Sequence, residues 1–509
     1  MVGVAVPHIR DSFHLGVTSL QWIVAGYIVA FAGLLFTGGV VGDRYGRRLA
    51  LVVGISVFGV GAVVSATAVD WRVLILGRVV QGLGAACSEP GTLSLLRQIH
   101  PDENQRLRVF GGWAAASGLA LAAGPVAAGL LVSLGGWRAV FAAEAIAAFL
   151  AAIVGALLLP ESRDPSEWRP DVPGQVLIAV CLATTTVSLI EGQDRGFGWP
   201  PVIVGWVVAA AALVAFLRVE RRHPEPVLDV TMFRDRTVSA GLLAAAASTF
   251  ALFAVLLLVS LDLEVVGNYS GLATAGVFAP MTVAMVIAGP LGARWAMRAG
   301  PAPPLVGGLA LATVACAGLD SVLVRPIPLA STIAALTVLG AGFGLVVAPM
   351  VGTVLTRVPA RRSGMGAAAV TASREIGGVM GIAILGAIVN GLLFTRLTHR
   401  LENLGIPVSY RHVVIDAVRR GTPLPKSGGG GGSGGSFLDR LIGSIRQTLV
   451  DKTVDAGKAA YVDSVRAALI VAVCVLAAGA FGVWLLLRHA DSDDTPRPNL
   501  SEPAGNKAG

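Results

Sequence analysis

Three ionisable side chains lie inside long apolar runs, where packing alone gives no reason for them. Arg78 and Glu89 lie in the run 73–95, and Glu144 lies in the run 139–159. A charge at the centre of a bilayer costs at least about 2.5 kcal/mol, so such residues normally face a polar interior. A partly desolvated carboxyl there can take up and release a proton. We therefore predict that Glu89 and Glu144 can carry a proton and that Arg78 faces a polar interior, with a purely structural Arg78 bonded to carbonyls as the alternative.

A second set of side chains could contact a substrate. Two acids near the end of an apolar run could attract cations, or could simply be solvated at an interface. Three aromatic residues on one helical stretch could stack on flat hydrophobic molecules, although helix packing is the more common role for such residues. We expect Glu375, by contrast, to pair with its neighbour Arg374. The predicted substrate-contacting residues are Trp22, Tyr27, Phe31, Gln81, Asp262 and Glu264.

The composition indicates that the elements carrying these residues cross a membrane. The chain has 509 residues, of which 54% are hydrophobic and only 14% are charged. A soluble protein carries roughly a quarter charged residues. The net charge of +8 does not favour nucleic-acid binding, because basic residues collect in the cytoplasmic loops of membrane proteins. No phosphate-binding loop, metal-ligand cluster or Ser/His/Asp set is visible, so we expect neither an enzyme nor a bound metal or cofactor.

Apolar stretches of about 20 residues, the length of a membrane span, recur along the whole chain. Thirteen such stretches are full spans. The opening 1–9 has the pattern of the tail of a further span, which gives fourteen spans if the N-terminus is incomplete. The sequence therefore predicts an all-α membrane protein. The thirteen full spans are predicted at 21–41, 49–67, 73–95, 109–132, 139–159, 172–190, 202–217, 238–261, 272–292, 304–319, 329–350, 366–394 and 467–487.

The loops between these spans differ in charge, and the difference predicts the orientation. The loops on one face are rich in arginine, whereas the short loops on the other face carry only Arg10, Arg72, Arg138, Arg195 and Arg325. Because arginine-rich loops stay in the cytoplasm, fourteen spans would place both termini there, including a disordered tail at 488–509. The arginine-rich loops contain the segments 44–48, 97–108, 163–169, 218–236, 294–298 and 357–362.

One long connection, 395–466, is predicted on the outer face. It contains a glycine- and serine-rich stretch at 427–436, which has the composition of a flexible linker. Apolar residues then recur at helical spacing between Phe437 and Leu449, which predicts an amphipathic helix on the outer surface. A loop of this length is uncommon in a compact domain, so a membrane protein that binds a partner and transports nothing remains an alternative.

A glycine- and arginine-rich motif joins the second and third predicted spans. The segment 39–48 has the sequence GVVGDRYGRR, and a weaker copy, GPLGARW, occupies 289–295. Glycines allow a tight turn, and the charged residues can cap helix ends and pair between halves of the molecule. This segment resembles the signature loop of the major facilitator superfamily. The residues that carry the resemblance are Gly39, Asp43, Arg44, Gly46, Arg47 and Arg48.

Two further motifs resemble elements of the same superfamily. The segment 78–84, RVVQGLG, resembles an element whose arginine takes part in proton coupling. The segment 118–129, GLALAAGPVAAG, resembles the antiporter signature, although Ala128 stands where a glycine is usual. The resemblance implies export and disfavours an uptake symporter of the same fold. The antiporter motif residues are Gly118, Gly124, Pro125 and Gly129.

Other segments resemble the branch of 14-span drug/proton antiporters. They are 20–27, 136–141 and 374–383, while Gly3, Glu144 and the acids at 262 and 264 depart from that branch's pattern. The resemblance implies two six-helix bundles that alternate access around a central cavity and exchange protons for an amphipathic small molecule. We expect a monomer in the bacterial plasma membrane that uses the proton gradient. The expected domains are 1–159, 160–236 with two linker spans, 237–394, the loop 395–466, the last span 467–487 and the tail 488–509.

Overall fold

The fold is known from a computed structural model, which describes all residues except 1, 14, 16, 101, 163–170, 224–225, 227, 268, 270, 323–327, 404–436 and 491–509. The described residues form helices and no strand, so the predicted all-α fold is confirmed. The first half contains α1 (Val2–Phe13), α2 (Val17–Tyr45), α3 (Arg47–Ala66), α4 (Trp71–Ile99) and α5 (Glu103–Leu158). Two helices follow, α6 (Val172–Arg195) and α7 (Pro200–Glu220). The remaining elements are η1 (Val230–Arg234), α8 (Arg236–Leu261), η2 (Asp262–Val266), α9 (Gly271–Ala299), α10 (Ala302–Val322), α11 (Leu329–Arg357), η3 (Ala360–Arg362), α12 (Ser363–Asn403) and α14 (Phe437–Ala490).

The helices of the described residues have the length and polarity of membrane spans. Eleven of them are long and apolar enough to cross a bilayer, so the count of fourteen is not confirmed. The predicted span 73–95 lies in α4, which is 29 residues long but carries Arg72, Arg78, Glu89 and Arg97 and is not among the eleven. These charges lower the mean hydropathy of α4 without shortening it.

The 56-residue element α5 contains two helices joined at a kink, and each of them carries one predicted span. The kink lies at Gly135 and Gly136, which have non-helical backbone angles. Gly136 has a φ of 70°, in the left-handed region that glycine adopts at no steric cost. The kink separates the predicted spans 109–132 and 139–159, as the sequence predicts.

Acidic residues begin several helices at one end of the bundle. Asp102 accepts a hydrogen bond from the Gln105 N–H at the start of α5, at 2.8 Å. Asp171 does the same for α6 through the Gly174 N–H, and Asp235 caps α8 through the Thr237 N–H. Each carboxylate satisfies an N–H group that has no partner within its own helix. We call this end, which also carries Asp43, the Asp43 end, and the opposite one the Glu264 end.

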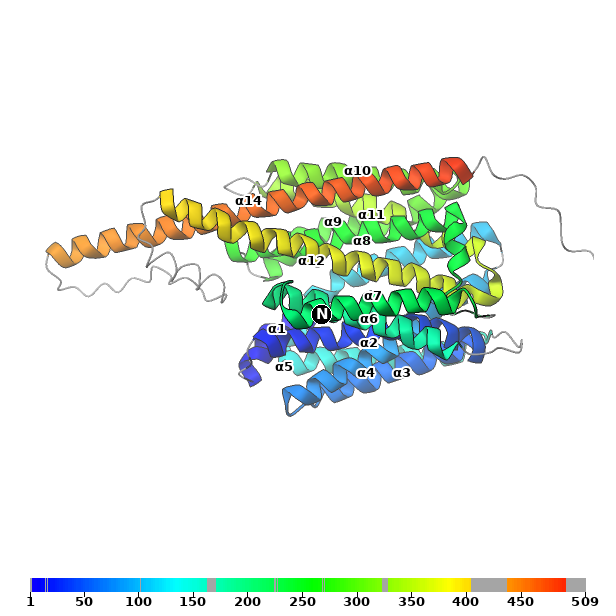
Figure 1. The fold of residues 1–509 in the computed structure, drawn as a ribbon. Coiled ribbons are helices and arrows are strands. Elements are labelled where there is room, and N and C mark those ends of the chain that lie inside the picture. The colour runs from blue at the N-terminus through cyan, green and yellow to red at the C-terminus, as the bar shows by residue number, and fades with distance from the viewer. Residues whose placement is uncertain are drawn as a thin grey trace, which may run out of the picture.

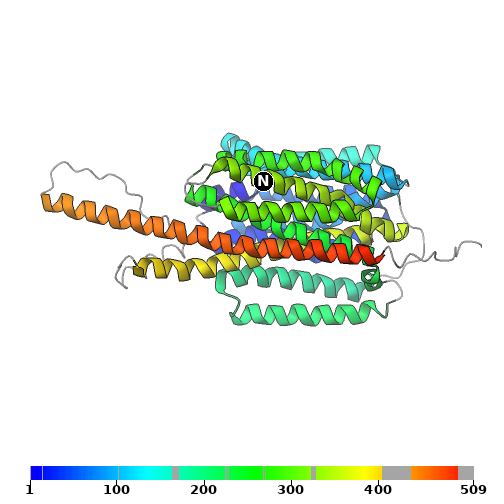
Figure 2. The same ribbon diagram turned by 90° about the horizontal axis from the view of Figure 1, so that it is seen from above.

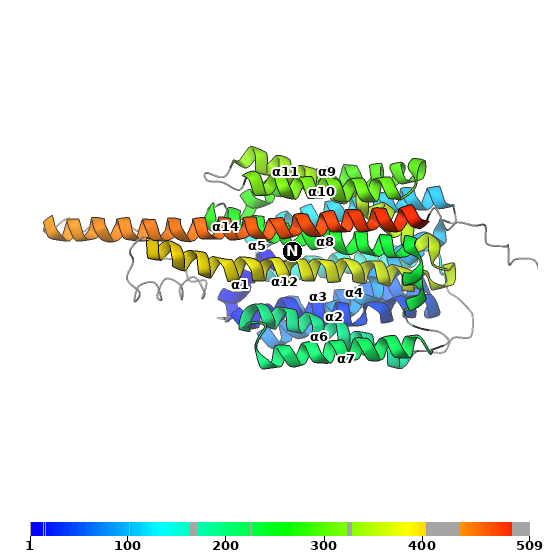
Figure 3. The same cartoon turned by 45° about the horizontal axis from the view of Figure 1, so that its top comes forward.

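The helices pack in two groups that contact one another along the bundle (Figure 1). The first group is α1 to α5, and the second is α8 to α14, with α12 packed against both α2 and α4 of the first group. The helix α6 contacts α2 and α12, and α7 packs on α6. The α6–α7 pair therefore lies at the edge of the bundle, where the two groups meet (Figures 2 and 3).

The helices on either side of the long connection extend further than the sequence predicts. The helix α12 continues to Asn403, and α14 is one helix from Phe437 to Ala490, so the helical extensions 395–403 and 437–466 replace much of the predicted loop. The stretch 437–449 is helical, as the sequence predicts, and it runs directly into the last predicted span. The two extensions project beyond the other helices at the Glu264 end (Figure 1). They pack through a buried apolar cluster of Leu397, Leu401, Ala456 and Ala460. The glycine-rich stretch 427–436 and the side chains that give 437–449 its amphipathic pattern lie outside the described residues.

Candidate functional site

A chain of hydrogen bonds links three polar residues inside the first group of helices. Arg78 on α4 donates from Nη1 to Oε1 of Gln81 at 2.9 Å, and Gln81 donates from Nε2 to Oε2 of Glu144 on α5 at 3.0 Å. Arg78 also donates from Nε to the carbonyl of Ile23 on α2 at 3.3 Å. Arg78 and Gln81 are buried, so the amide of Gln81 relays the interaction between the guanidinium and the carboxylate. A buried arginine satisfied in this way needs no water.

One of the three aromatic residues predicted on α2 lies against this chain. The Arg78 guanidinium lies 4.6 Å from the centre of the Tyr27 ring, a cation–π contact. Tyr27 stacks on Phe31 with ring centres 5.8 Å apart and an interplanar angle of 7°. Phe31 belongs to the buried core, and Trp22 is half-buried on the same helix. Tyr27 is thus the aromatic residue that contacts the polar chain, whereas Phe31 packs.

An ion pair joins the two groups of helices. Arg374 on α12 lies with Nη1 at 3.7 Å from Oε1 of Glu89 on α4. The guanidinium is also 5.6 Å from the centre of the Trp113 ring on α5. The sequence-based expectation that Arg374 pairs with Glu375 is wrong, because adjacent residues on a helix point in different directions. Glu375 instead lines a cavity of about 30 Å³ between α2, α6 and α12, which has space for water but not for a drug-sized molecule.

The two predicted acids of the second group share one helical turn but differ in their exposure to solvent. Asp262 and Glu264 occupy the single π-helical turn η2 that follows α8. Asp262 is buried, while Glu264 is exposed and accepts a hydrogen bond from the Ser260 hydroxyl at 3.3 Å. Only Glu264 is thus open to solvent for attracting a cation. Both acids belong to η2 in the second group of helices, whereas the Arg78 chain lies in the first group. The six predicted substrate-contacting residues therefore do not form one cluster.

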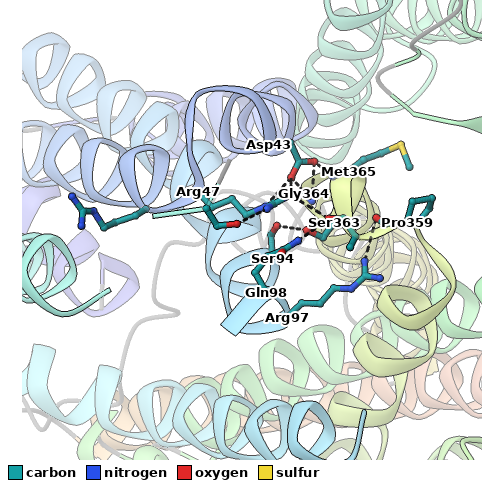
Figure 4. A network of polar contacts seen from close by, with 12 residues as sticks. Asp43, Arg47, Ser94, Arg97, Gln98, Pro359, Ser363, Gly364 and Met365 are labelled. Atoms are coloured by element: carbon teal, nitrogen blue, oxygen red, sulfur yellow. Dashed lines mark hydrogen bonds and ion pairs between the residues drawn. The ribbon is translucent and has the colours of Figure 1, made fainter. Parts of the chain in front are cut away.

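The signature-loop acid connects the two groups at the Asp43 end. The Asp43 carboxylate, at the end of α2, accepts hydrogen bonds from the backbone N–H groups of Gly364 at 3.0 Å and Met365 at 3.3 Å. These N–H groups belong to the first turn of α12, where a carboxylate is favoured by the helix dipole. Arg47 donates to the same carboxylate at 2.6 Å and to the Ala360 carbonyl at 3.2 Å. Figure 4 shows these contacts converging on the loop before α12.

Three residues near the end of α4 strengthen this connection, and the sequence analysis did not single them out. Arg97 donates to the carbonyls of Val358 at 2.6 Å and Pro359 at 3.4 Å. Gln98 donates to the carbonyl of Ala360 at 2.8 Å, and the hydroxyls of Ser94 and Ser363 lie 2.6 Å apart (Figure 4). The signal for them was weak, because Arg97 looks in sequence like any other arginine of a cytoplasmic loop.

The remaining signature-loop residues shape the turn between α2 and α3. Gly46 has a φ of 122°, a conformation that other residues rarely adopt. Gly39 packs so closely on α12 that an added Cβ would lie 2.6 Å from the Gly364 carbonyl oxygen. Arg48 lies 4.0 Å from the Glu161 carboxylate, and the Arg44 guanidinium lies over the Tyr45 ring.

The predicted antiporter motif runs along the first half of α5. Gly118 lies against α9, since an added Cβ would be 3.3 Å from side-chain atoms of Met285 and Val286. Gly129 would have nothing within 4 Å, so it does not pack tightly. Gly124 is half-buried, and the side chain of Pro125 lies outside the described residues. Gly118 therefore lets α5 and α9 approach closely.

The arrangement combines an Arg–Gln–Glu chain in one group of helices, an ion pair between the groups, and a polar connection that holds the groups together at one end. Within the described residues, no three His, Cys, Asp or Glu side chains are grouped so that they could hold a metal ion.

Comparisons with known proteins place these features in a family context. A family model described as Major Facilitator Superfamily matches residues 1–382. Multidrug resistance protein Stp of Mycobacterium tuberculosis is 30% identical over 418 residues, which cover 82% of this chain and 78% of Stp. Drug efflux pump JefA of the same species is 31% identical, covering 82% of each chain. Puromycin resistance protein pur8 of Streptomyces alboniger is 32% identical, covering 77% of this chain and 78% of pur8.

Solved structures agree at the level of the fold. The proton:xylose symporter XylE superposes with a TM-score of 0.52 at 14% identity, covering 75% of this chain and 83% of XylE. A bacterial homolog of the human lysosomal transporter Spinster gives a TM-score of 0.51 at 17% identity, covering 96% of this chain and 93% of the homolog. At these identities the likeness concerns the arrangement of helices alone.

Proposed function

The chain belongs to the major facilitator superfamily, a family of multi-pass membrane transporters rather than enzymes, and from that premise we propose that it exports amphipathic small molecules in exchange for protons. Its relatives at about 30% identity are named for drug efflux and antibiotic resistance, which supports export. The glycine-rich segment with Gly118, Gly124, Pro125 and Gly129 in α5 supports the same direction.

The observation that carries the proposal is the ion pair between Glu89 and Arg374. The pair is the contact through which a protonation event on α4 would reach α12 in the other group of helices. A proton on Glu89 removes its charge, and the guanidinium of Arg374 then loses its attraction to α4. A cationic substrate near Glu89 would compete with Arg374 in the same way. Protons and substrate would therefore act on one interface, which is the requirement for exchange.

The Arg78–Gln81–Glu144 chain gives the first group of helices a second carboxylate in contact with a fixed positive charge. In the proposed mechanism Glu144 takes up a proton from the Glu264 end, and Gln81 transmits the loss of its charge to Arg78. Tyr27, which lies under Arg78, contacts the guanidinium of this chain from α2.

The polar connection at the Asp43 end is proposed to close the cytoplasmic side while the outer side is open. The bonds from Asp43 to α12, and from Arg97 and Gln98 to the loop before it, must break for the groups to separate there. We further propose the topology of the 14-span branch, with both termini in the cytoplasm of a bacterial cell, a monomer in the plasma membrane, and α6 and α7 as linker spans. The expected domains 1–159, 160–236, 237–394 and the last span 467–487 remain part of this proposal, with the helical extensions 395–403 and 437–466 in place of much of the expected loop.

Transport in inverted membrane vesicles tests the direction and the coupling. A cationic fluorescent dye should accumulate in vesicles that carry the protein when a proton gradient is imposed, and collapse of the gradient with a protonophore should release it. Vesicles with Arg374→Gln provide the matched control for the proposed pair. Gradient-driven dye loss from the vesicles would instead indicate an uptake symporter. No gradient-dependent movement of any tested dye or antibiotic, in vesicles where the protein is folded, would contradict proton-coupled transport.

A further inference from the structure

The weaker copy of the signature loop lacks the acid that holds the first one together. The segments GVVGDRYGRR and GPLGARWAMR align residue by residue from 39 and 289, which places Ala293 at the position of Asp43 and Met297 at that of Arg47. Arg294 and Arg298 correspond to Arg44 and Arg48. The second loop therefore keeps two arginines and has lost the carboxylate of the first.

These arginines line a cavity of about 610 Å³ at the Asp43 end, between the start of α5 and the end of α9. Both helices contribute, so the cavity spans the contact between the two groups. A third arginine, Arg108 on α5, faces it from the other side. The described residues that line the cavity are Asn104, Arg108, Pro290, Arg294, Met297 and Arg298.

No acidic side chain of the described residues balances the three guanidinium groups. None of the ion pairs or side-chain hydrogen bonds among those residues involves Arg108, Arg294 or Arg298, and all three are exposed. In the first loop, by contrast, Arg47 meets Asp43 at 2.6 Å and Arg48 approaches Glu161. The nearby Asp102 is occupied with the cap of its own helix. The cavity thus concentrates positive charge that the described chain does not neutralise.

We propose that this cavity binds a phosphate group, that of an anionic phospholipid headgroup in the cytoplasmic leaflet. Guanidinium groups bind phosphate oxygens in a fork geometry that suits a cavity with several of them. Basic cavities between membrane helices on the cytoplasmic side are suited to anionic headgroups. Leu291 and Trp295 are exposed on the same turns of α9, and a tryptophan at the end of a span favours the headgroup level of a bilayer.

A phosphate held there would fasten α5 to α9. The two helices cross closely just inside the cavity, where a Cβ added at Gly111 would lie 3.0 Å from the Ala293 Cβ and 3.1 Å from the Pro290 Cα. Arg108 lies on one side of this crossing and Arg294 on the other, so one anion contacting both would take the place of the missing carboxylate. The lipid would serve on this side of the bundle as Asp43 serves on the other. This inference does not depend on proton coupling or on the direction of transport.

The test measures lipid retained by the purified full chain. Native mass spectrometry would compare phosphatidylglycerol with phosphatidylcholine on the wild type, on Arg108→Gln/Arg294→Gln/Arg298→Gln, and on the control Arg218→Gln/Arg221→Gln/Arg222→Gln. The control removes three exposed arginines from the same end of the bundle, at the end of α7 and away from the cavity lined by α5 and α9. We expect the cavity variant to bind phosphatidylglycerol roughly 100-fold more weakly, about fivefold for each arginine removed, and the control to bind it as the wild type does.

Two further measurements keep the result independent of misfolding and separate the two sources of phosphate. Phosphatidylglycerol should raise the unfolding temperature of the wild type and of the control, and should leave that of the cavity variant unchanged. Arg294→Lys, which keeps the charge, should retain most of the lipid. Equal retention by the cavity variant and the control would overturn the proposal. Displacement of phosphatidylglycerol from the wild type by millimolar inorganic phosphate would overturn the lipid assignment in favour of a soluble phosphate.

Discussion

Glu89 and Arg374 lie 285 residues apart in the chain and meet at 3.7 Å between α4 and α12. Both belong to helices that also take part in the connection at the Asp43 end, since Ser94, Arg97 and Gln98 follow Glu89 on α4 and Ser363 begins α12. In the proposed mechanism, a change in the pair reaches those contacts along α4, which contains Pro90 just after Glu89, and along α12.

The first prediction concerns Glu89→Gln. The substitution keeps the size of the side chain but fixes it without charge, so the proposed pair can no longer respond to protons. Charge pairs in contact have coupling energies of about 0.5–3 kcal/mol, and we expect gradient-driven efflux to fall by roughly 10- to 100-fold. Substrate exchange without a proton gradient should continue. Efflux in inverted vesicles, measured between pH 6 and pH 8, checks both outcomes.

The charge-swapped variant Glu89→Arg/Arg374→Glu provides the matching control. If the two side chains act as a pair, the double variant should recover more activity than either single charge reversal. If the loss of activity in the double variant equals the combined losses of the two single charge reversals, the two residues act independently.

The second prediction concerns Asp43→Ala. This variant leaves the first N–H groups of α12 without their carboxylate, at a cost of about 1 kcal/mol for a lost cap. The closed state at the Asp43 end should then be populated about fivefold less relative to the open one. In a background without native cysteines, a reporter at Ser363→Cys should react correspondingly faster with a membrane-impermeant thiol reagent in inverted vesicles. Asp70→Ala is the control, because Asp70 precedes α4 at the other end and makes no side-chain cap bond. Unchanged labelling in Asp43→Ala would contradict the closing role.

The third prediction uses the contact between Ser94 and Ser363. Their hydroxyls are 2.6 Å apart, so cysteines at these two positions would place their sulfur atoms close to the S–S bond length of about 2.05 Å. Ser94→Cys/Ser363→Cys, with the four native cysteines replaced, should cross-link on mild oxidation and lose transport, and a reducing agent should restore it. Ser88→Cys/Ser363→Cys should not cross-link, because the Ser88 hydroxyl bonds within its own helix to Ala85. Full transport by the cross-linked protein would rule out an opening at this end.

The sequence predicted the membrane-spanning helices well because each span is a continuous run of apolar residues, which is a local feature of the sequence. The bend in α5 could also be anticipated, since Gly135 and Gly136 separate two such runs. The helical residues 395–403 and 450–466 were missed for a physical reason, whereas 437–449 was predicted as a helix from its apolar spacing. Hydropathy indicates which residues a bilayer would solvate, and the two missed stretches are helical outside the apolar runs and are held partly by Leu397, Leu401 and their partners.

Residues of the site could be predicted only where the residue or its motif stands out from its immediate neighbours in the chain. Arg78, Glu89 and Glu144 could be selected because a charge in an apolar run stands out, and Asp43 because its loop has a recognisable pattern. The partners of these residues could not be read from the sequence. The contacts from Glu89 to Arg374 and from Arg97 to Val358 connect helices far apart in the chain, and nothing in the residue types near either end specifies the other.

The last prediction separates the structural and the coupling roles of the Arg78 chain. Gln81→Leu has a similar volume but removes the amide between Arg78 and Glu144, which leaves a buried guanidinium with one fewer acceptor. A buried polar group that loses its partner costs about 1–3 kcal/mol, so the unfolding temperature of the purified protein should fall. Glu144→Gln keeps an oxygen that can accept from Gln81 and should change that temperature little, yet it removes the charge. If Glu144 carries a proton, Glu144→Gln alone should abolish the pH dependence of efflux while the protein remains stable. Loss of stability without any change in the pH profile, in both variants, would leave the chain with a structural role and would assign the proton to Glu89.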